Sequence, residues 1–143
     1  MDQAPVVQQM ALYFALGTLS EKAASELTVQ AFSNYNRNIS LFKLNHEIAF
    51  IRAAQPLLFK YFKRNKKNKI QEDIRRFLIL NSQFDINNWR SFVKKATSED
   101  ISMLILYYVF QFNESSIAES LEVSQGTVRL RLIKSLRLLG SLL

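Results

Sequence analysis

The stretch VSQGTVRLRLIKSLRLLG, near the C-terminal end, carries amide, hydroxyl and guanidinium groups at helical spacing. Glutamine can form two hydrogen bonds with adenine in the major groove of DNA, and arginine can form two with guanine. Val128 and Leu132 have the spacing of core residues on one face of a helix. If they face inward, then Gln125, Arg129 and Leu130 face outward near the start of that helix. The pattern therefore predicts a helix whose N-terminal end reads base edges.

Basic residues further along the same stretch suit the DNA backbone. Arg131, Lys134 and Arg137 are better placed to meet phosphates than bases. The predicted DNA-binding residues of this stretch, including the small polar ones at its start, are Ser124, Gln125, Thr127, Arg129, Leu130, Arg131, Lys134 and Arg137.

A second basic cluster, KYFKRNKKNK at 60–69, holds six positive charges and no acid. The whole chain has a formal net charge of +7 at pH 7, which favours a polyanionic partner, because cations that bind phosphates release condensed counterions. The predicted DNA-binding residues of this cluster are Lys60, Lys63, Arg64, Lys66, Lys67 and Lys69. The aromatic residues among them, Phe59, Tyr61 and Phe62, either stack on unpaired bases or, as is commoner for this spacing, pack in a core.

Composition excludes most other chemistry. The chain has no cysteine, which rules out disulfides and thiolate metal sites and is typical of a reducing compartment. The single histidine, His46, has no second histidine or cysteine with which to share a metal ion. The carboxylates of Glu72–Asp73 and Glu99–Asp100 diverge on a helix and are better explained as complements to a helix dipole. We therefore expect no metal, no cofactor and no enzymatic activity.

The elements that position these residues are expected to be helices, so the predicted fold class is all-α. The 143-residue chain is 48% hydrophobic but has only three glycines and two prolines, so it lacks the turns that separate strands. Apolar spacing predicts a first helix over Val6–Leu19. A second helix is expected to begin at a cap on Thr18 or Ser20 and to end at NYNRN, 34–38. Three further helices are predicted over 45–64, 70–81 and 85–96. Pro56 is expected to kink or break the helix over 45–64, because proline lacks a backbone N–H.

Nothing in the sequence predicts a membrane protein. The N-terminal segment MDQAPVVQQMALYFALGTLS carries Asp2 where a signal peptide has positive charge. The longest apolar run, MLILYYVF at 103–110, is too short to cross a bilayer. We therefore expect a cytoplasmic protein with no membrane partner.

The last third of the chain has the pattern of a helix-turn-helix unit. Three helices are predicted, SEDISMLILYYVFQF, NESSIAESL and SQGTVRLRLIKSLRLL, with only EVS between the second and the third. Asn113 and Ser124 are expected to cap these two helices through their side-chain oxygens. The small side chain of Ala118 lets the two helices cross closely. The predicted apolar contacts of the unit are Ile117, Ala118, Leu121, Val123, Val128 and Leu132.

The segment ESSIAESLEVSQGTVRLRLIKSLRLL resembles the promoter-reading C-terminal domain of bacterial RNA polymerase sigma factors, especially the small extracytoplasmic-function type. The residues that match the family's pattern are Ile117, Ala118, Leu121, Val123, Ser124, Gly126, Thr127, Val128, Arg131, Leu132 and Leu139. The helix-turn-helix of quorum regulators is also similar, but it usually has histidine where Arg131 stands.

The N-terminal half resembles the same family over two segments. SELTVQAFSNY at 25–35 is similar to the sigma helix that docks on the polymerase clamp, and AFIRAAQPLLFKYFKR at 49–64 is similar to the next helix. The residues that would bind RNA polymerase core on this resemblance are Glu26, Leu27, Gln30 and Phe32. The resemblance also implies a sigma region-2-like helical domain at 1–66, a helical connector at 67–96 and a region-4-like helix-turn-helix domain at 97–143. The last of these would bind a −35-type promoter element.

Two alternatives stay open, because the sequence departs from the family where strand separation is carried out. Ala49 stands where the family usually has tryptophan, and Pro56 stands where it has a polar residue. The first alternative is a non-initiating helix-turn-helix regulator that uses its N-terminal half to dimerise or to bind a partner. The second is a protein-interaction module, such as a decoy that binds an anti-sigma protein without touching DNA.

The last predicted helix is more apolar than a solvated helix end requires. Its outer residues Leu130, Ile133, Leu138 and Leu142 cannot all point into the same small core as Val128, Leu132, Leu136 and Leu139. The outer residues therefore either pack on the N-terminal half or contact another chain. A contact with another chain would mean self-association through this leucine-rich helix.

Overall fold

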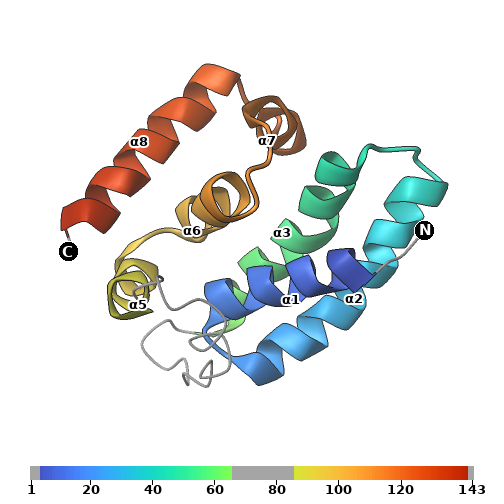
Figure 1. Cartoon of the computed structure of the whole chain (residues 1–143), viewed down its shortest axis with the longest axis horizontal. Coiled ribbons are helices and arrows are strands. Elements are labelled where there is room, and N and C mark those ends of the chain that lie inside the picture. The colour runs from blue at the N-terminus through green and yellow to red at the C-terminus, as the bar shows by residue number, and fades with distance from the viewer. Residues whose placement is uncertain (1–3, 66–85, 142–143) are drawn as a thin grey trace.

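The computed structural model describes residues 4–65 and 86–141, and every regular element within these two ranges is helical (Figure 1). The all-α prediction is therefore confirmed for this part of the chain. In chain order the helices are α1 (Ala4–Thr18), α2 (Glu21–Ser40), α3 (His46–Arg64), α5 (Ile86–Lys95), α6 (Ser98–Leu104), the π-helix η2 (Ile105–Val109), α7 (Glu114–Leu121) and α8 (Gln125–Ser141). The helix predicted at 70–81 lies outside the described residues.

Helix α2 begins where the sequence predicts but ends later. The Ser20 hydroxyl accepts a hydrogen bond from the backbone N–H of Ala23 at 3.1 Å, which confirms one of the two expected caps. The predicted end at NYNRN is wrong, because α2 continues through this segment. Asparagine in a helix costs only about 0.7 kcal/mol relative to alanine. Burial of Tyr35 and a 3.1 Å hydrogen bond from the Asn38 amide to the Ala49 carbonyl offset that preference.

Helix α3 runs unbroken through Pro56, so of the predicted kink or break the break is wrong, and the kink stays a prediction. The backbone carbonyl that loses its donor to proline belongs to Arg52, one turn earlier. Both residues are exposed, so water can replace the missing N–H. On the other side of the helix, buried Ala53, Ala54 and Leu58 hold the same stretch against the core. Packing therefore outweighs the loss of one exposed hydrogen bond.

The helix that begins with α6 changes pitch at Ile105, where η2 starts. The backbone N–H of Phe110 donates to the carbonyl of Ile105, five residues earlier, at 3.1 Å, which is the pattern of a π-helix. Gln111 follows with a φ of 57°, a left-handed conformation that glycine adopts more readily. The segment SEDISMLILYYVFQF is therefore helical only to Val109 and contains a wide turn that its apolar pattern does not predict.

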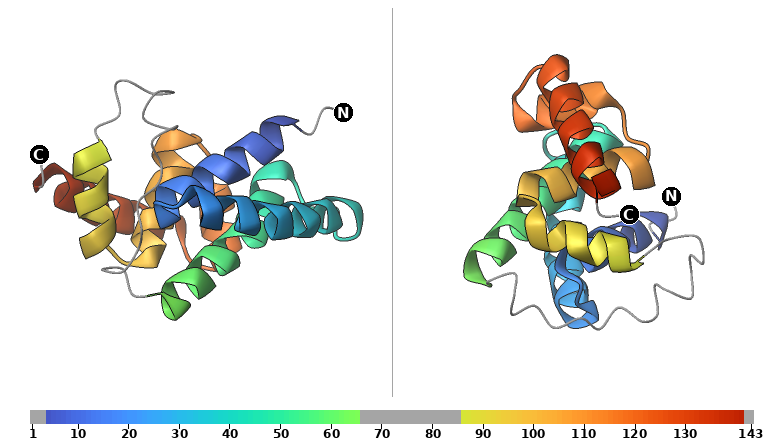
Figure 2. Two further views of the ribbon diagram at one scale, coloured as in Figure 1. Left: turned by 90° about the horizontal axis from the view of Figure 1, so that it is seen from below. Right: turned by 90° about the vertical axis from the view of Figure 1, so that its left-hand side faces the viewer.

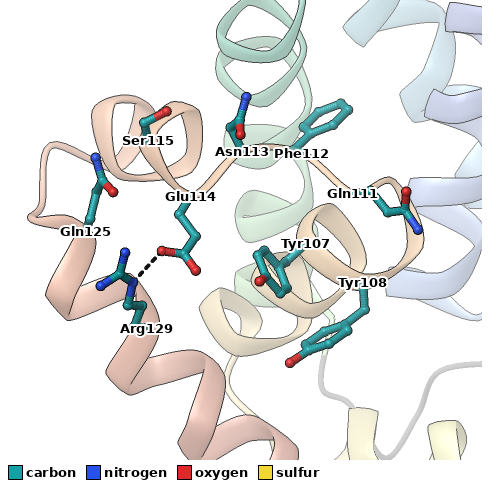
Figure 3. Close-up of a pocket in the computed structure, with 9 residues that line it drawn as sticks. All are labelled: Tyr107, Tyr108, Gln111, Phe112, Asn113, Glu114, Ser115, Gln125 and Arg129. Carbon is teal, nitrogen blue, oxygen red and sulfur yellow. Dashed lines mark hydrogen bonds and ion pairs between the residues drawn. The ribbon is translucent and has the colours of Figure 1, made fainter.

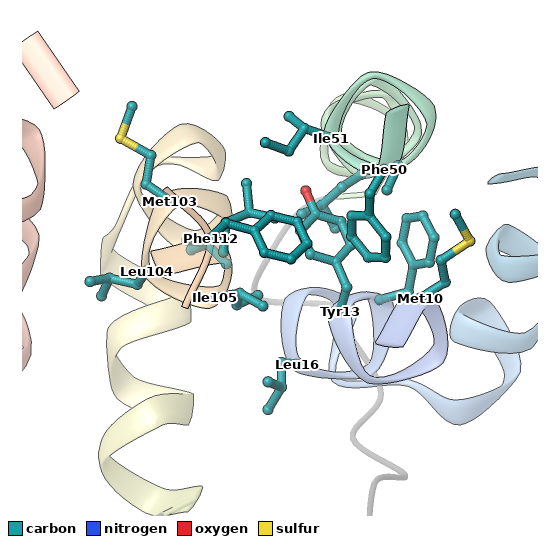
Figure 4. Close-up of a cluster of buried hydrophobic side chains, with 14 of the residues drawn as sticks. Met10, Tyr13, Leu16, Phe50, Ile51, Met103, Leu104, Ile105 and Phe112 are labelled. Carbon is teal, nitrogen blue, oxygen red and sulfur yellow. The ribbon is translucent and has the colours of Figure 1, made fainter. Parts of the chain in front are cut away.

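One hydrophobic core joins the N-terminal and C-terminal helices (Figure 4). The side chains at its centre include Met10, Tyr13, Leu16, Phe50, Ile51, Met103, Leu104, Ile105 and Phe112. The ring of Phe50 packs edge-to-face against Tyr13 and Phe112, with centroids 5.9 and 5.5 Å apart. The core takes in residues from all three predicted segments, 1–66, 67–96 and 97–143. The three-part division stays a prediction, but its parts share one interior.

Two buried hydrogen bonds link elements that are distant in the sequence. The Tyr13 hydroxyl of α1 lies 2.7 Å from the Ser102 hydroxyl of α6. The indole N–H of Trp89, on α5, donates to the backbone carbonyl of Leu16 at 2.8 Å. Burial raises the pKa of Tyr13 well above its ordinary value. Helices α5 and α6 are thus held against α1 by specific polar contacts as well as by apolar packing.

Helices α2 and α8 lie at opposite ends of the molecule (Figures 1 and 2). Between them, α6 packs against α1 and α3 on one side and against α8 on the other. The outer face of α8 is therefore left clear of the N-terminal helices.

Within 4–65 and 86–141, none of the helices combines the length and the apolar character that spanning a membrane requires.

Candidate nucleic-acid interface

Helices α7 and α8 are joined by a tight turn. Glu122 follows α7 in a left-handed conformation, with φ 58° and ψ 42°. The next backbone N–H, that of Val123, donates to the Ala118 carbonyl at 3.0 Å. The Ser124 hydroxyl then accepts a hydrogen bond from the backbone N–H of Thr127 at 3.1 Å. The predicted cap of α8 and the short connection between the two helices are both confirmed.

The predicted side-chain cap of α7 is wrong. Asn113 precedes α7, but its side chain makes no capping hydrogen bond. The backbone N–H of Asn113 donates to the carboxylate of Glu47 on α3 at 3.0 Å, a separate contact from the missing cap. The start of α7 is therefore positioned by a contact with a distant helix, which a local capping preference cannot predict.

Ala118, on α7, is buried as the sequence predicts. Of its neighbours, Ile117, Val128 and Leu132 are also buried. Leu121 and Val123 are partly buried and pack against the same core. The six residues predicted to make apolar contacts are therefore buried or partly buried, as expected.

The opposite face of α8 is open to solvent. Gln125 is exposed, the Arg129 side chain is 65% exposed, and Leu130 is 63% exposed. Of the other predicted DNA-binding residues, Ser124, Lys134 and Arg137 are exposed, and Thr127 and Arg131 are half-buried. The exposed residues of this set therefore begin at the cap of α8 and lie around its outer side, whereas half-buried Arg131 is turned by about 200° from Arg129.

Two arginines on α8 form ion pairs with carboxylates on neighbouring helices. Arg129 Nε donates to Glu114 Oε2, on α7, at 2.6 Å, and Arg131 Nη1 lies 3.1 Å from Glu99 Oε2, on α6. The hydrogen bond to Glu114 and its negative charge raise the pKa of Arg129. Glu99 does lie in the first turn of its helix, as predicted, but it also pairs with an arginine. The role of Glu114 has no local signal in the sequence, because its partner is 15 residues away.

A cleft of about 580 Å³ lies beside Arg129, between η2 and the start of α8 (Figure 3). Its lining consists of Tyr107, Tyr108, Gln111, Phe112, Asn113, Glu114, Ser115, Gln125 and Arg129. Figure 3 shows the Glu114 carboxylate turned towards Arg129, with Tyr107 on the other side of the cleft. Burial, followed by the neighbouring Tyr107 and Glu114, raises the pKa of Tyr108. The sequence does not predict that Tyr107 and Tyr108 line a cleft, because both lie in the apolar run MLILYYVF. Only their hydroxyl groups distinguish them from core residues there.

The leucine-rich face of α8 divides differently from the prediction. Leu130 and Ile133 are exposed, so they do not pack on the N-terminal half, whereas Leu138 packs against the core. Leu136 was expected inside but is exposed, because Ser135 takes the buried position at that turn. Leu142 lies outside the described residues.

The second basic cluster is not brought next to the first. Lys60, Lys63 and Arg64 are exposed at the C-terminal end of α3, which lies apart from α8 in Figures 1 and 2. The aromatic residues Phe59, Tyr61 and Phe62 are half-buried. The remaining predicted residues of this cluster, Lys66, Lys67 and Lys69, lie outside the described residues. The structure therefore presents two separate basic surfaces.

The predicted polymerase-binding residues fall on two sides of α2. Glu26 and Gln30 are exposed, together with Val29, which is 74% exposed and was not predicted. Leu27 and Phe32 are half-buried and pack against the core. Only Glu26 and Gln30 of the predicted set are therefore fully presented to a partner.

Comparison with known proteins does not assign the chain to a family. No protein-family model matches the sequence, and no curated protein matches it significantly. Among the residues that the structure describes, no group of three or more His, Asp or Glu side chains is placed to hold a metal ion. The geometry of α7 and α8 is therefore the basis for assigning a function.

Proposed function

We propose that the chain is a sigma-factor-like transcription protein that binds duplex DNA through α7 and α8. The observation that carries this proposal is the division of α8 into two faces. Val128 and Leu132 are buried, while Gln125 and Arg129 are exposed directly after the Ser124 cap. In helix-turn-helix proteins, the N-terminal residues of the second helix reach base edges in the major groove. A −35-type promoter element is the proposed target.

The charge on α8 supports the same proposal. The helix carries Arg129, Arg131, Lys134 and Arg137 and no acidic residue. Arginine near the helix start is suited to guanine, and the later cations are suited to phosphates. Exposed Leu130 supplies an apolar group of the kind that contacts the methyl group of thymine.

RNA polymerase core is the proposed partner of α2. Glu26, Val29 and Gln30 form an exposed face on this helix. Because α2 and α8 lie at opposite ends of the molecule, a partner on α2 leaves α8 free to bind DNA (Figure 1). A cytoplasmic location goes with these two partners.

A non-initiating regulator is the second candidate, and α3 favours it. Ala49 is buried, and Phe62 packs against the core. Neither position therefore offers a fully exposed ring to a base that leaves the stack, and strand separation must offset a few kcal/mol for each unstacked step. On this reading the N-terminal half binds a partner and DNA stays double-stranded.

Binding to duplex DNA as a function of salt tests the first part of the proposal. If the three later cations of α8 meet phosphates, they should contribute about −2.7 to the log–log salt slope. The matched control is Lys43→Gln, which removes one exposed cation from the loop between α2 and α3 and should leave the slope unchanged. No affinity for duplex DNA at low salt would contradict the proposal and favour an interaction module that uses the exposed Leu130 and Ile133.

A pull-down with purified core polymerase, followed by permanganate footprinting of a selected promoter, separates the two candidates. We expect the wild-type chain to bind core enzyme and Glu26→Lys to bind it more weakly, because the substitution reverses an exposed charge on α2. Reactive thymines near the start site would identify an initiation factor. Stable polymerase binding without reactive thymines would identify a regulator.

A further inference from the structure

The ion pair between Glu114 and Arg129 joins the two helices of the proposed DNA-binding unit (Figure 3). Glu114 is the first residue of α7, and Arg129 lies in the second turn of α8. The Glu114 side chain is only 22% exposed, whereas the Arg129 side chain is 65% exposed. The carboxylate is therefore the anchored partner, and the guanidinium is the group that reaches solvent.

The atoms used in this pair matter for base recognition. Arg129 bonds to Glu114 through Nε, at 2.6 Å. A bidentate contact with guanine needs two further N–H groups that point the same way, and the two terminal nitrogens of Arg129 supply them. Arginine has several rotatable bonds, and ordering such a side chain on binding costs about 0.5 to 1.5 kcal/mol. A guanidinium that is already held by Glu114 avoids part of that cost.

The negative charge of Glu114 also acts against sequence-independent binding. A free arginine at the edge of the groove can bind any nearby phosphate, whatever the base sequence. Beside Arg129, the Glu114 carboxylate repels the full negative charge of a phosphate more strongly than the uncharged, acceptor-bearing edge of a guanine. The pair therefore favours contacts with bases over contacts with the backbone.

From this geometry we propose that Glu114 is a positioning residue that sets the base preference of Arg129 in the major groove. The inference rests on the proposed DNA binding through α8. Glu114 acts through Arg129 and does not itself contact a base.

The pair between Glu99 and Arg131 provides a matched control. It also joins a carboxylate to an arginine of α8, at 3.1 Å, but through Nη1, and the Glu99 side chain is 51% exposed. Arg131 lies two residues beyond Arg129, which turns it by about 200° around the helix and away from that flank. Glu99→Gln should therefore raise affinity for all duplexes alike and leave base preference unchanged.

The experiment begins with selection of bound sequences from a pool of random 20-base-pair duplexes by the full-length wild-type chain. Affinity is then measured by fluorescence anisotropy for the selected duplex and for one in which the preferred G·C pair is replaced by A·T. We expect the wild-type chain to discriminate by about 5- to 150-fold at that position. Glu114→Gln should reduce this ratio to less than about one third of the wild-type value, with higher affinity for random duplex.

Five results overturn the inference or separate it from the proposed function. An unchanged ratio in Glu114→Gln overturns it, and so does an equal loss in Glu99→Gln, which would indicate a general charge effect. The double variant Glu114→Gln with Arg129→Ala should discriminate no worse than Arg129→Ala alone, and an additional loss would show that Glu114 acts independently. A wild-type chain that binds duplex but selects no sequence refutes base readout itself, whereas a chain that binds no duplex refutes the proposed function. Circular dichroism melting of each variant shows whether it is folded.

Discussion

The cations of α8 and the cations at the end of α3 are held in different ways. On α8, Arg129 and Arg131 each bond to a carboxylate on another helix, which fixes where their guanidinium groups point. At the end of α3, Lys60 and Lys63 are exposed and form no ion pair with any residue in the described part of the chain. Both surfaces are basic, but only one of them is organised by neighbouring helices.

The net charge of +7 cannot distinguish the two surfaces, because it counts oriented and solvated cations alike. The contacts of their side chains do distinguish them. An oriented arginine has a planar set of donors that suits a base edge, whereas a solvated lysine is a point charge that suits any phosphate. We expect the start of α8 to read bases and the end of α3 to attract the DNA backbone independently of sequence. The four predictions below test that division and the core that carries both surfaces.

The largest effect is expected from Phe50→Ala, which removes a buried ring between α1 and the segment after η2. The loss should lower the free energy of unfolding by about 3 to 5 kcal/mol. Because one core serves both halves, circular dichroism and Trp89 fluorescence should report the same single transition at a lower Tm. Two separate transitions in the wild-type chain would show that the basic surfaces belong to independent domains.

The next largest effect separates Arg129→Ala from Lys134→Ala. Arg129→Ala should lower affinity for the selected duplex by about 1 to 3 kcal/mol and flatten preference at one base pair. Lys134→Ala, further along the same helix, should weaken binding to all duplexes alike. Competition assays with selected and random duplexes measure both. Equal losses on both duplexes for Arg129→Ala would remove the distinction between the two surfaces.

A smaller effect concerns the core at alkaline pH. Burial raises the pKa of Tyr13 above its ordinary value of 10.0, so the folded state keeps the proton that the unfolded chain releases. The wild-type chain should therefore lose stability as pH rises above 10, by up to about 1.4 kcal/mol per pH unit from this group. Tyr13→Phe should be less stable at neutral pH but should lack this part of the decline. Urea denaturation from pH 8 to pH 11 compares the two, and parallel curves would contradict the assignment.

The smallest effect is expected from Lys60→Gln combined with Lys63→Gln. Exposed charges of this kind contribute at most about 1 kcal/mol each, so affinity for duplex should fall only slightly. Each phosphate contact that is lost should make the log–log salt slope about 0.9 shallower. Base preference should stay as in the wild type, as measured on the selected duplex and its A·T replacement. A change in preference would show that α3 also takes part in readout.

The sequence predicts those features that depend on neighbours within one or two turns. The caps at Ser20 and Ser124 and the buried positions of Val128 and Leu132 follow from local hydrogen bonds and helical periodicity, and the structure confirms them. Local preference fails where a distant contact decides. At Asn113, the carboxylate of Glu47, 66 residues away, takes the backbone N–H and the side-chain cap is absent.

The candidate site shows the same limit. The exposed residues at the start of α8 are predictable, because a buried face of known period leaves one flank outside. The carboxylate beside Arg129 is not, because Glu114 belongs to another helix and depends on how α7 crosses α8. The apolar pattern also predicts Leu136 inside, but the structure shows Leu136 exposed. The buried residue at that turn is Ser135, although a polar residue is not expected there.

The π-helical turn η2 ends the helix that begins at Ser98 with a turn wider than an α-helical one, which takes up one extra residue. Deleting one residue within Ile105–Val109 would restore the ordinary pitch without breaking the helix that begins at Ser98. The residues that follow the deletion would then have to reach the start of α7 along a segment that is one residue shorter. The cleft beside Arg129 therefore depends on the length of this segment as well as on its composition. A one-residue deletion could close the cleft while every tyrosine, glutamate and arginine around it is kept.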